Sequence, residues 1–251
     1  MNKSTQPTIV KANDIVEAAF HLTFLEQMLV LSCISQIDAK QPCDSKRAFT
    51  VTSAEIHELT ESTNSYYSIR EAALRLYDRS IKIDGVKDEM RWLDRRTFLE
   101  NGSVTLHFST AVLPYLSNLS ERFTAYKLKH IAKFRSSHAI RLYELLIQWM
   151  CVGEREVTVE WLRHAFCAEE TYPRTIDFTR RVIDPSVRDI NEHSNLWVEM
   201  TTKKTGRAVT HYRFTFGLKN PEPERITEKQ IQANARPGET RQAVAKRLRK
   251  T

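Results

Sequence analysis

Four arginines and one asparagine gather within residues 174–191, a segment that contains the run DFTRRVIDPSVRDIN. In a helix, successive residues turn by about 100°, which places these side chains opposite an apolar stripe that contains Ile176, Ile183 and Ile190. Guanidinium groups bind phosphate oxygens or the O6 and N7 of guanine, and asparagine pairs with adenine. The polar side therefore has the chemistry of a helix that reads the major groove of DNA, and it consists of Arg174, Arg180, Arg181, Arg188 and Asn191.

The aspartates of this segment leave a second interpretation open. Asp177 and Asp184 lie among the arginines, where they would repel phosphates. Spacings of three and four residues also allow them to orient the arginines, and carboxylates accept from cytosine amino groups. A surface helix held by Arg–Asp pairs, with no DNA to bind, fits the same pattern.

Pro185 stands in the middle of the segment. Within a helix it removes one backbone donor and crowds the carbonyl of Arg181, which predicts a bend. The alternative is that Asp184 caps a second short helix with proline at its first position.

A basic hairpin is expected directly downstream. Residues 196–218 alternate apolar and polar side chains on both sides of a basic tip, the pattern of two paired strands. Lys203, Lys204 and Arg207 are placed at this tip to contact phosphates, and Gly206 supplies a turn with positive φ.

The order of elements around this hairpin occurs twice along the chain. In the first copy, Asn13 or Asp14 caps a short helix, the pairs Thr23/Glu26 and Thr52/Glu55 open two further helices as capping boxes, and the strand AFTV lies between them. A helix over 66–78, capped by Ser65, and an antiparallel sheet follow. The second copy runs through SHAIRLYELLIQWM, REVTV, EWLRHAF, the arginine segment and the basic hairpin, with Ala139, Leu142, Tyr143, Leu146, Trp149 and Met150 on one apolar helix face.

Helix-turn-helix followed by a hairpin is the pattern of a winged helix. The sequence thus predicts an α+β, mainly helical protein with two tandem winged-helix domains at residues 11–126 and 127–218. The joining segment SERFTAYKLKHIAKFRSS carries apolar Phe123, Tyr126, Leu128 and Ile131, so we expect it to dock against the protein. Residues 219–251 hold three prolines and nine basic against four acidic side chains, which predicts a disordered basic C-terminal tail.

The helix over 66–78 corresponds to the arginine segment in the first copy. Its exposed side carries Tyr67, Arg70 and Arg75, fewer arginines than the second copy has. It either touches DNA more weakly or forms a protein-contact surface, and the sequence does not decide between them.

The composition excludes several classes of protein. The chain has 251 residues, a formal charge of +7 and 41% hydrophobic residues, and no apolar run approaches the roughly 20 residues that a membrane span needs. The N-terminus has no signal-peptide pattern, so we expect a cytoplasmic protein without a membrane partner. Four scattered cysteines form no CxxC pair, which predicts reduced thiols and no zinc site.

Catalytic motifs are missing from the sequence. There is no phosphate-binding GxxxxGK[ST] loop, and eight histidines show no HExxH spacing. Tyr66 and Tyr67 lack the metal ligands that a nicking tyrosine would need. We therefore predict no enzyme activity, no metal and no cofactor.

The runs RFTAYKL, SHAIRLYELL, DFTRRVIDPSVRDIN and KKTGRAVTHYRFTF resemble the iteron-binding plasmid replication initiators over residues 11–217. The resemblance implies a bacterial protein whose monomer binds direct repeats at a plasmid origin and whose dimer represses its own promoter at an inverted repeat. It implies that the first domain contacts the DNA backbone and dimerises, and that the second domain binds specific sequences. The implied partners are double-stranded DNA, the host replication initiator and the replicative helicase.

Two other classes remain open from the sequence. A winged-helix transcriptional repressor would occlude a promoter without initiating replication. A replisome adaptor would use the first domain only as a protein-contact module.

Overall fold

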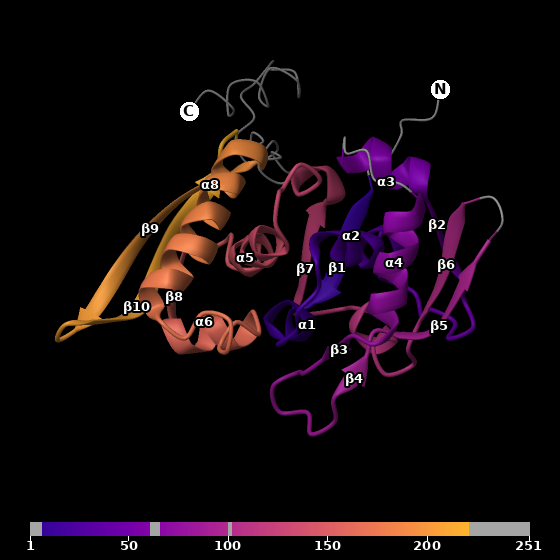
Figure 1. The fold of residues 1–251 in the computed structure, drawn as a ribbon, viewed down its shortest axis with the longest axis horizontal. Helices are drawn as coiled ribbons and strands as arrows, with labels where there is room; N and C mark the ends of the chain where they lie inside the picture. The colour runs from indigo at the N-terminus through magenta and orange to yellow at the C-terminus, as the bar shows by residue number, and fades with distance from the viewer. Residues whose placement is uncertain (1–6, 61–65, 100–101, 221–251) are drawn as a thin grey trace, which may run out of the picture. The chain divides into compact units, whose positions relative to one another are not determined.

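The computed structural model describes residues 7–60, 66–99 and 102–220. It confirms the α+β class and the duplicated architecture (Figure 1). The cap expected at Ser65 and the basic tail beyond residue 220 lie outside the described residues.

The first winged helix contains a helix-turn-helix and a three-stranded sheet. The sheet pairs β2 (Phe49–Thr52), β6 (Ser103–Phe108) and β5 (Leu93–Phe98) in that order, all antiparallel, and Val51 lies opposite Val104 in its register. A small antiparallel ribbon of β3 (Ser80–Ile81) and β4 (Met90–Arg91) lies in the chain between the second helix of the helix-turn-helix and the hairpin of the sheet. The elements are α2 (Phe24–Ile34), β2 (Phe49–Thr52), α3 (Ser53–Thr60), α4 (Tyr66–Tyr77), β5 (Leu93–Phe98) and β6 (Ser103–Phe108).

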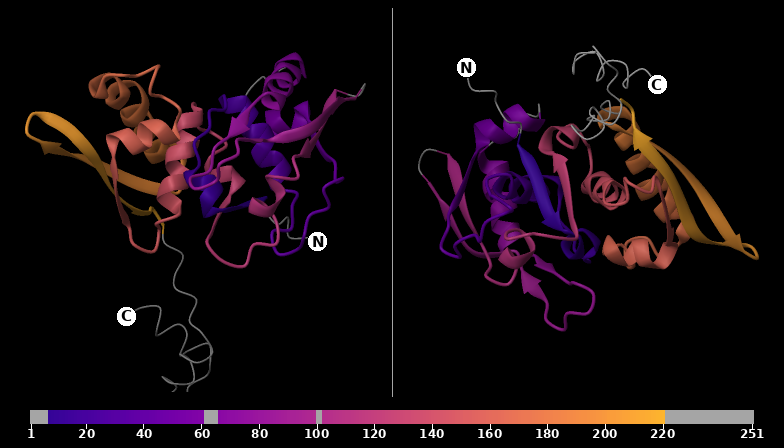
Figure 2. Two further views of the ribbon diagram at one scale, coloured as in Figure 1. Left: turned by 90° about the horizontal axis from the view of Figure 1, so that it is seen from below. Right: turned by 180° about the vertical axis from the view of Figure 1, so that it is seen from behind.

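The second winged helix repeats this order with a longer hairpin. Its sheet pairs β8 (Glu154–Thr158), β10 (Ala208–Leu218) and β9 (Leu196–Thr205) in that order, the same topology as the first sheet. In both views of Figure 2 its terminal hairpin extends well past the neighbouring helices. The elements are α5 (Ser137–Ile147), β8 (Glu154–Thr158), α6 (Val159–Ala165), α7 (Thr175–Phe178), the π-helical turn η3 (Thr179–Ile183), α8 (Asp184–His193), β9 (Leu196–Thr205) and β10 (Ala208–Leu218).

A two-stranded ribbon joins the start of the chain to the segment between the winged helices. β1 (Thr8–Ala12) pairs antiparallel with β7 (Phe123–Lys127), and the short α1 (Asn13–Glu17) follows β1. The 3-10 turns η1 (Leu113–Tyr115) and η2 (Leu128–His130) flank β7. The docking expected for the joining segment is thus confirmed, although Phe123 is exposed. The boundary predicted after residue 126 falls within β7 and stays a prediction.

Local sequence signals set most helix starts. Thr23 and Glu26 form the expected capping box, as do Thr52 and Glu55, whose backbone and side-chain groups bond reciprocally at 2.7 and 3.1 Å. The cap predicted at Asn13 or Asp14 is wrong. Ala12 precedes α1 without a side-chain cap, because the Asn13 amide oxygen accepts from Thr124 of β7 at 2.8 Å instead.

The buried core largely follows the predicted apolar faces, but the two residues predicted beyond the end of α5 depart from them, and Met150 is only half-buried. Ala139, Leu142, Tyr143 and Leu146 are buried, but Trp149 is 41% exposed. α5 ends at Ile147, so the helical spacing that placed Trp149 on the buried face no longer applies there. Within the described ranges, no helix combines the length and apolarity needed to cross a bilayer.

Candidate nucleic-acid interface

The arginine segment is helical throughout, and the π-helical turn η3 separates α7 from α8. The Asp184 N–H bonds to the Thr179 carbonyl, five residues back, so the helix widens directly before Pro185. Proline then occupies the first turn of α8, where a backbone donor is not required. Asp184 is the first residue of α8 and not its cap, because Ile183 precedes it with helical dihedrals and no side-chain cap.

This π-turn explains a wrong prediction at Ile176. Because a π-turn takes in one additional residue, residues before it rotate by about 100° relative to those after it. Ile176, expected on the apolar stripe, is 62% exposed, whereas Phe178, Val182 and Ile190 are buried. The helix therefore presents a large aliphatic side chain on its solvent side.

Three arginines of the segment are exposed and unengaged. The side chains of Arg180, Arg181 and Arg188 make no hydrogen bond or ion pair within the part of the chain that the structure describes. Arg174 is also exposed, and it pairs with Asp177 at 2.6 Å. These side chains meet the requirement for binding a polyanion, since free guanidinium donors point to solvent from a rigid helix.

Asn191 and Asp189 hold the helix in place. The Asn191 amide donates to the Val198 carbonyl at 2.7 Å and accepts from the Val198 N–H at 2.8 Å, which fastens α8 to β9. Asp189 accepts from the Arg135 N–H at 2.7 Å. Asn191 thus has a structural role, and its reading of adenine stays a prediction.

The basic hairpin has the expected tip. Gly206 has φ +62°, which places it in the left-handed region that glycine adopts without strain. The side chains of Lys204 and Arg207 are exposed and form no polar contact with other described residues. Lys203 differs, because its ammonium pairs with Glu156 of β8 at 3.0 Å. That pairing also holds the pKa of Glu156 below its usual value.

The first winged helix engages its arginines differently. Arg70 stacks over the Phe98 ring of β5 at 4.5 Å, and Arg75 pairs with the buried Glu26 carboxylate at 2.9 Å. Tyr67 is 70% exposed. Of the three residues predicted to contact DNA here, two are therefore tied to neighbouring elements.

Sequence reasoning missed two groups of residues. The run RWLDRRTF places Arg91, Arg95 and Arg96 on and beside β5. The guanidinium groups of Arg91 and Arg96 lie 5.6 and 4.3 Å from the Tyr77 ring of α4, while Arg95 is exposed beside them. The signal that could have found them is the presence of three arginines soon after the second helix of a predicted winged helix. The exposed Ile176 is the other omission, and a helical wheel with a uniform 100° step could not have found it.

The two surfaces together suit a duplex. A helix with free guanidinium groups can enter the major groove, and basic hairpins can follow the backbone on either side.

In the described ranges, no group of three or more histidine, cysteine or acidic side chains is arranged to hold a metal ion.

Comparisons with known proteins agree with this architecture. The family model described as "Initiator Replication protein, WH1" matches residues 8–147, and that described as "Initiator Rep protein, WH2" matches residues 158–216. A "Replication initiation protein" of Escherichia coli is 24% identical over 212 residues, which cover 79% of this chain and 66% of the relative. A 27.6 kDa E. coli protein of uncharacterized function is 22% identical over 219 residues, covering 79% of this chain and 91% of that one.

A solved structure shares the fold. The crystal structure of the Pi initiator protein in complex with iteron DNA superposes with a TM-score of 0.74 at 19% identity, over 88% of this chain and 100% of that one. The two family matches together cover most of the sequence. The first extends through the end of α5, and the second runs from the last residue of β8 into β10. The chain therefore belongs to the initiator replication protein family.

Proposed function

We propose that this protein initiates plasmid replication by binding direct repeats, or iterons, at the plasmid origin as a monomer. The observation that carries the proposal is the set of unengaged arginines, Arg180, Arg181 and Arg188, on the exposed side of the second helix of a helix-turn-helix. Such donors pair with guanine edges in the major groove. The Pi initiator, which has this fold, was solved with iteron DNA.

In this proposal the second winged helix reads sequence and the first contacts the backbone. Arg180, Arg181 and Ile176 face the bases, where guanidinium groups pair with guanine and the aliphatic side chain contacts a thymine methyl group. Lys203, Lys204 and Arg207 contact phosphates from the hairpin. In the first winged helix, Tyr67, Arg70 and Arg95 contact the backbone and not the bases. Stacking on Phe98 limits the reach of Arg70, and the ion pair with Glu26 limits that of Arg75.

The bound monomer helps to open the origin and recruits the host replication initiator and the replicative helicase. A dimer formed through the first domain represses the protein's own promoter at an inverted repeat. Family membership supports these steps, and the basic hairpins and exposed arginines supply the DNA contacts that each of them needs.

Two measurements on the same protein test the proposal. Size-fractionated monomer should protect each repeat of the origin array in a hydroxyl-radical footprint, and a plasmid that carries only this origin should replicate when the protein is supplied in trans. The Arg181→Ala variant should fail in both assays while keeping the wild-type melting temperature. Protection of the promoter without replication of the origin plasmid would favour a transcriptional repressor instead.

A further inference from the structure

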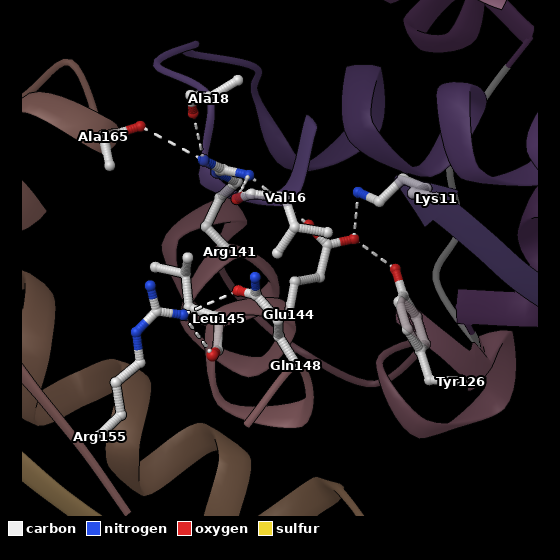
Figure 3. A network of polar contacts seen from close by, with 10 residues as sticks. All are labelled: Lys11, Val16, Ala18, Tyr126, Arg141, Glu144, Leu145, Gln148, Arg155 and Ala165. Atoms are coloured by element: carbon white, nitrogen blue, oxygen red, sulfur yellow. Dashed lines mark hydrogen bonds and ion pairs between the residues drawn. The ribbon is translucent and has the colours of Figure 1, made fainter. Parts of the chain in front are cut away.

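α5 carries two fully buried charges on successive turns, Arg141 and Glu144, which are 3% and 0% exposed (Figure 3). The Arg141 guanidinium donates to the carbonyls of Val16 and Ala18 at 2.9 and 2.6 Å, and to that of Ala165 at 3.5 Å. Burial lowers the pKa of Arg141 to about 10, so the group is charged at neutral pH. Three backbone oxygens therefore surround one buried cation.

These carbonyls belong to helix ends. Val16 and Ala18 lie at the C-terminal end of α1, and Ala165 is the last residue of α6. Carbonyls of a last turn have no partner within their own helix, and they carry its negative partial charge. The Arg141 guanidinium therefore caps the C-terminal ends of two helices, α1 near the start of the chain and α6 in the second winged helix.

The end of α1 is itself fixed to the first winged helix. Ala19 exchanges two backbone hydrogen bonds with Lys82, at 2.8 and 2.9 Å. The Phe20 ring packs edge-on against Trp92, with 5.1 Å between ring centroids. The Arg141 guanidinium lies 3.9 Å from the centre of the Phe20 ring. A continuous line of contacts therefore leads from α5 through Phe20 to Trp92.

A second buried arginine reaches the same helix end from β8. Arg155 is 8% exposed and donates to the Glu17 carboxylate at 2.7 Å. It also donates to the Leu145 carbonyl at 2.8 Å and to the Gln148 amide oxygen at 2.9 Å. These two bonds to the second winged helix fix the orientation of the Arg155 side chain.

Glu144 ties α5 to the β1–β7 ribbon. Its carboxylate accepts from the Lys11 ammonium and from the Tyr126 hydroxyl, both at 2.5 Å (Figure 3). Because removal of one member leaves another charge buried without a partner, such a cluster resists rearrangement.

We infer that Arg141 and Arg155 are positioning residues that hold the end of α1, and with it the first winged helix, at a fixed place on the second winged helix. They thereby set the spacing at which the two winged helices meet one duplex. A planar guanidinium group can satisfy several acceptors in set directions, whereas the point charge of a lysine cannot reproduce that geometry. The inference rests on the proposed function, in which both winged helices contact the same DNA.

The test measures how strictly the protein requires that spacing. Full-length wild-type protein and the Arg141→Lys variant are titrated onto the native origin repeat and onto a repeat with one base pair inserted between its two protected segments. The insertion displaces the segments by about 3.4 Å along the helix axis. Wild-type affinity should fall about tenfold on the inserted repeat, because one winged helix must release its contacts.

Arg141→Lys should bind the native repeat more weakly than the wild type, because a more flexible connection between the winged helices lowers the affinity gained when both bind at once. For the same reason its affinity should fall less than about threefold on the inserted repeat. Tyr143→Phe is the matched control on α5, because it removes the bond from the hydroxyl to Asn195 at 2.9 Å but leaves both arginines in place. It should keep the full penalty of the insertion. Loss of stability alone would lower binding to both duplexes equally.

If Arg141→Lys fails to fold, Glu17→Gln takes its place, because Glu17 is 39% exposed and only its pair with Arg155 weakens. An insertion penalty equal to that of the wild type in both variants would overturn the inference. Wild-type protein that protects only one segment of the native repeat would overturn the proposed two-domain contact itself, so the two failures are distinguishable.

Discussion

The two winged helices share a topology but use the arginines of their second helices in opposite ways. In α4, Arg75 is paired with the buried Glu26, and Arg70 lies on Phe98. In the α7–α8 segment, Arg180 and Arg181 extend into solvent without a described partner. Engaged arginines stabilise the domain that carries them, whereas free arginines keep their donors for a ligand. Counting arginines on a predicted helix therefore cannot separate the two uses.

Removing Glu26 should produce the largest effect and should act on stability. Glu26→Ala deletes the capping box of α2 and the partner of Arg75 and Arg79, which together cost about 3 kcal/mol in free energy of unfolding. Urea denaturation measures this loss. If Arg75 or Arg79, once freed, read bases, the variant would also gain preference for the origin repeat over random DNA, and we expect no such gain.

The same carboxylate predicts an acid-sensitive first winged helix. Burial raises the pKa of Glu26, but the Thr23 N–H and the two arginines outweigh it, and the net pKa lies below the usual 4.5. Because the pKa of Glu26 is lower in the folded state, its ionised carboxylate stabilises the fold above about pH 4.5. This stability is lost as the pH falls through the folded-state pKa. Glu26→Gln should therefore lose less stability than the wild type between pH 5 and pH 3, as followed by thermal melts. Parallel curves for both proteins would contradict this assignment.

Substitution of the free arginines should act on binding. Arg180→Ala or Arg181→Ala should weaken binding to the origin repeat by about 1–3 kcal/mol if the side chain pairs with a base edge, with a much smaller change on random DNA. Competition gel shifts measure both affinities. Arg70→Ala is the matched variant in α4 and should reduce the two affinities equally. Equal losses for Arg181→Ala would assign that side chain to phosphate contact.

Much of this contrast was accessible from the sequence. The order of elements, two capping boxes and the positive-φ glycine follow from local rules that tertiary packing left intact, as at Thr23, Thr52 and Gly206. The exposure of Arg180 and Arg181 followed from helical spacing. These predictions depend on neighbours within one or two turns, where sequence distance and spatial distance agree.

The predictions that failed depend on contacts between distant residues or on irregular backbone. Asn13 gives up its capping role to Thr124, which is 111 positions away in the chain. Ile176 turns to solvent because a π-turn interrupts the uniform helical step. The pairing of Arg75 with Glu26 joins two helices whose separation no periodicity encodes.

Ile176 offers a smaller and sharper test of the same contrast. Because its side chain is exposed on the solvent side, Ile176→Ala should leave the free energy of unfolding nearly unchanged. If it contacts a thymine methyl group, it should cost about 1 kcal/mol of specific binding. Replacing that thymine by uracil in the repeat should weaken the wild type and leave the variant unaffected. A variant that is destabilised instead would indicate that Ile176 packs within the protein.

The hairpin of the second winged helix gives the smallest effect, measured as a salt slope. Each phosphate contact contributes about one unit to the dependence of log K on log salt concentration, so Lys204→Ala and Arg207→Ala should each reduce the slope by about one. Lys203 pairs with Glu156 at 3.0 Å, so Lys203→Ala should reduce it less. Glu156→Gln should release Lys203 and increase the slope, while sequence preference stays the same. Equal slopes for Lys203→Ala and Lys204→Ala would mean that the ion pair opens on DNA and that engaged and free cations are equivalent at this hairpin.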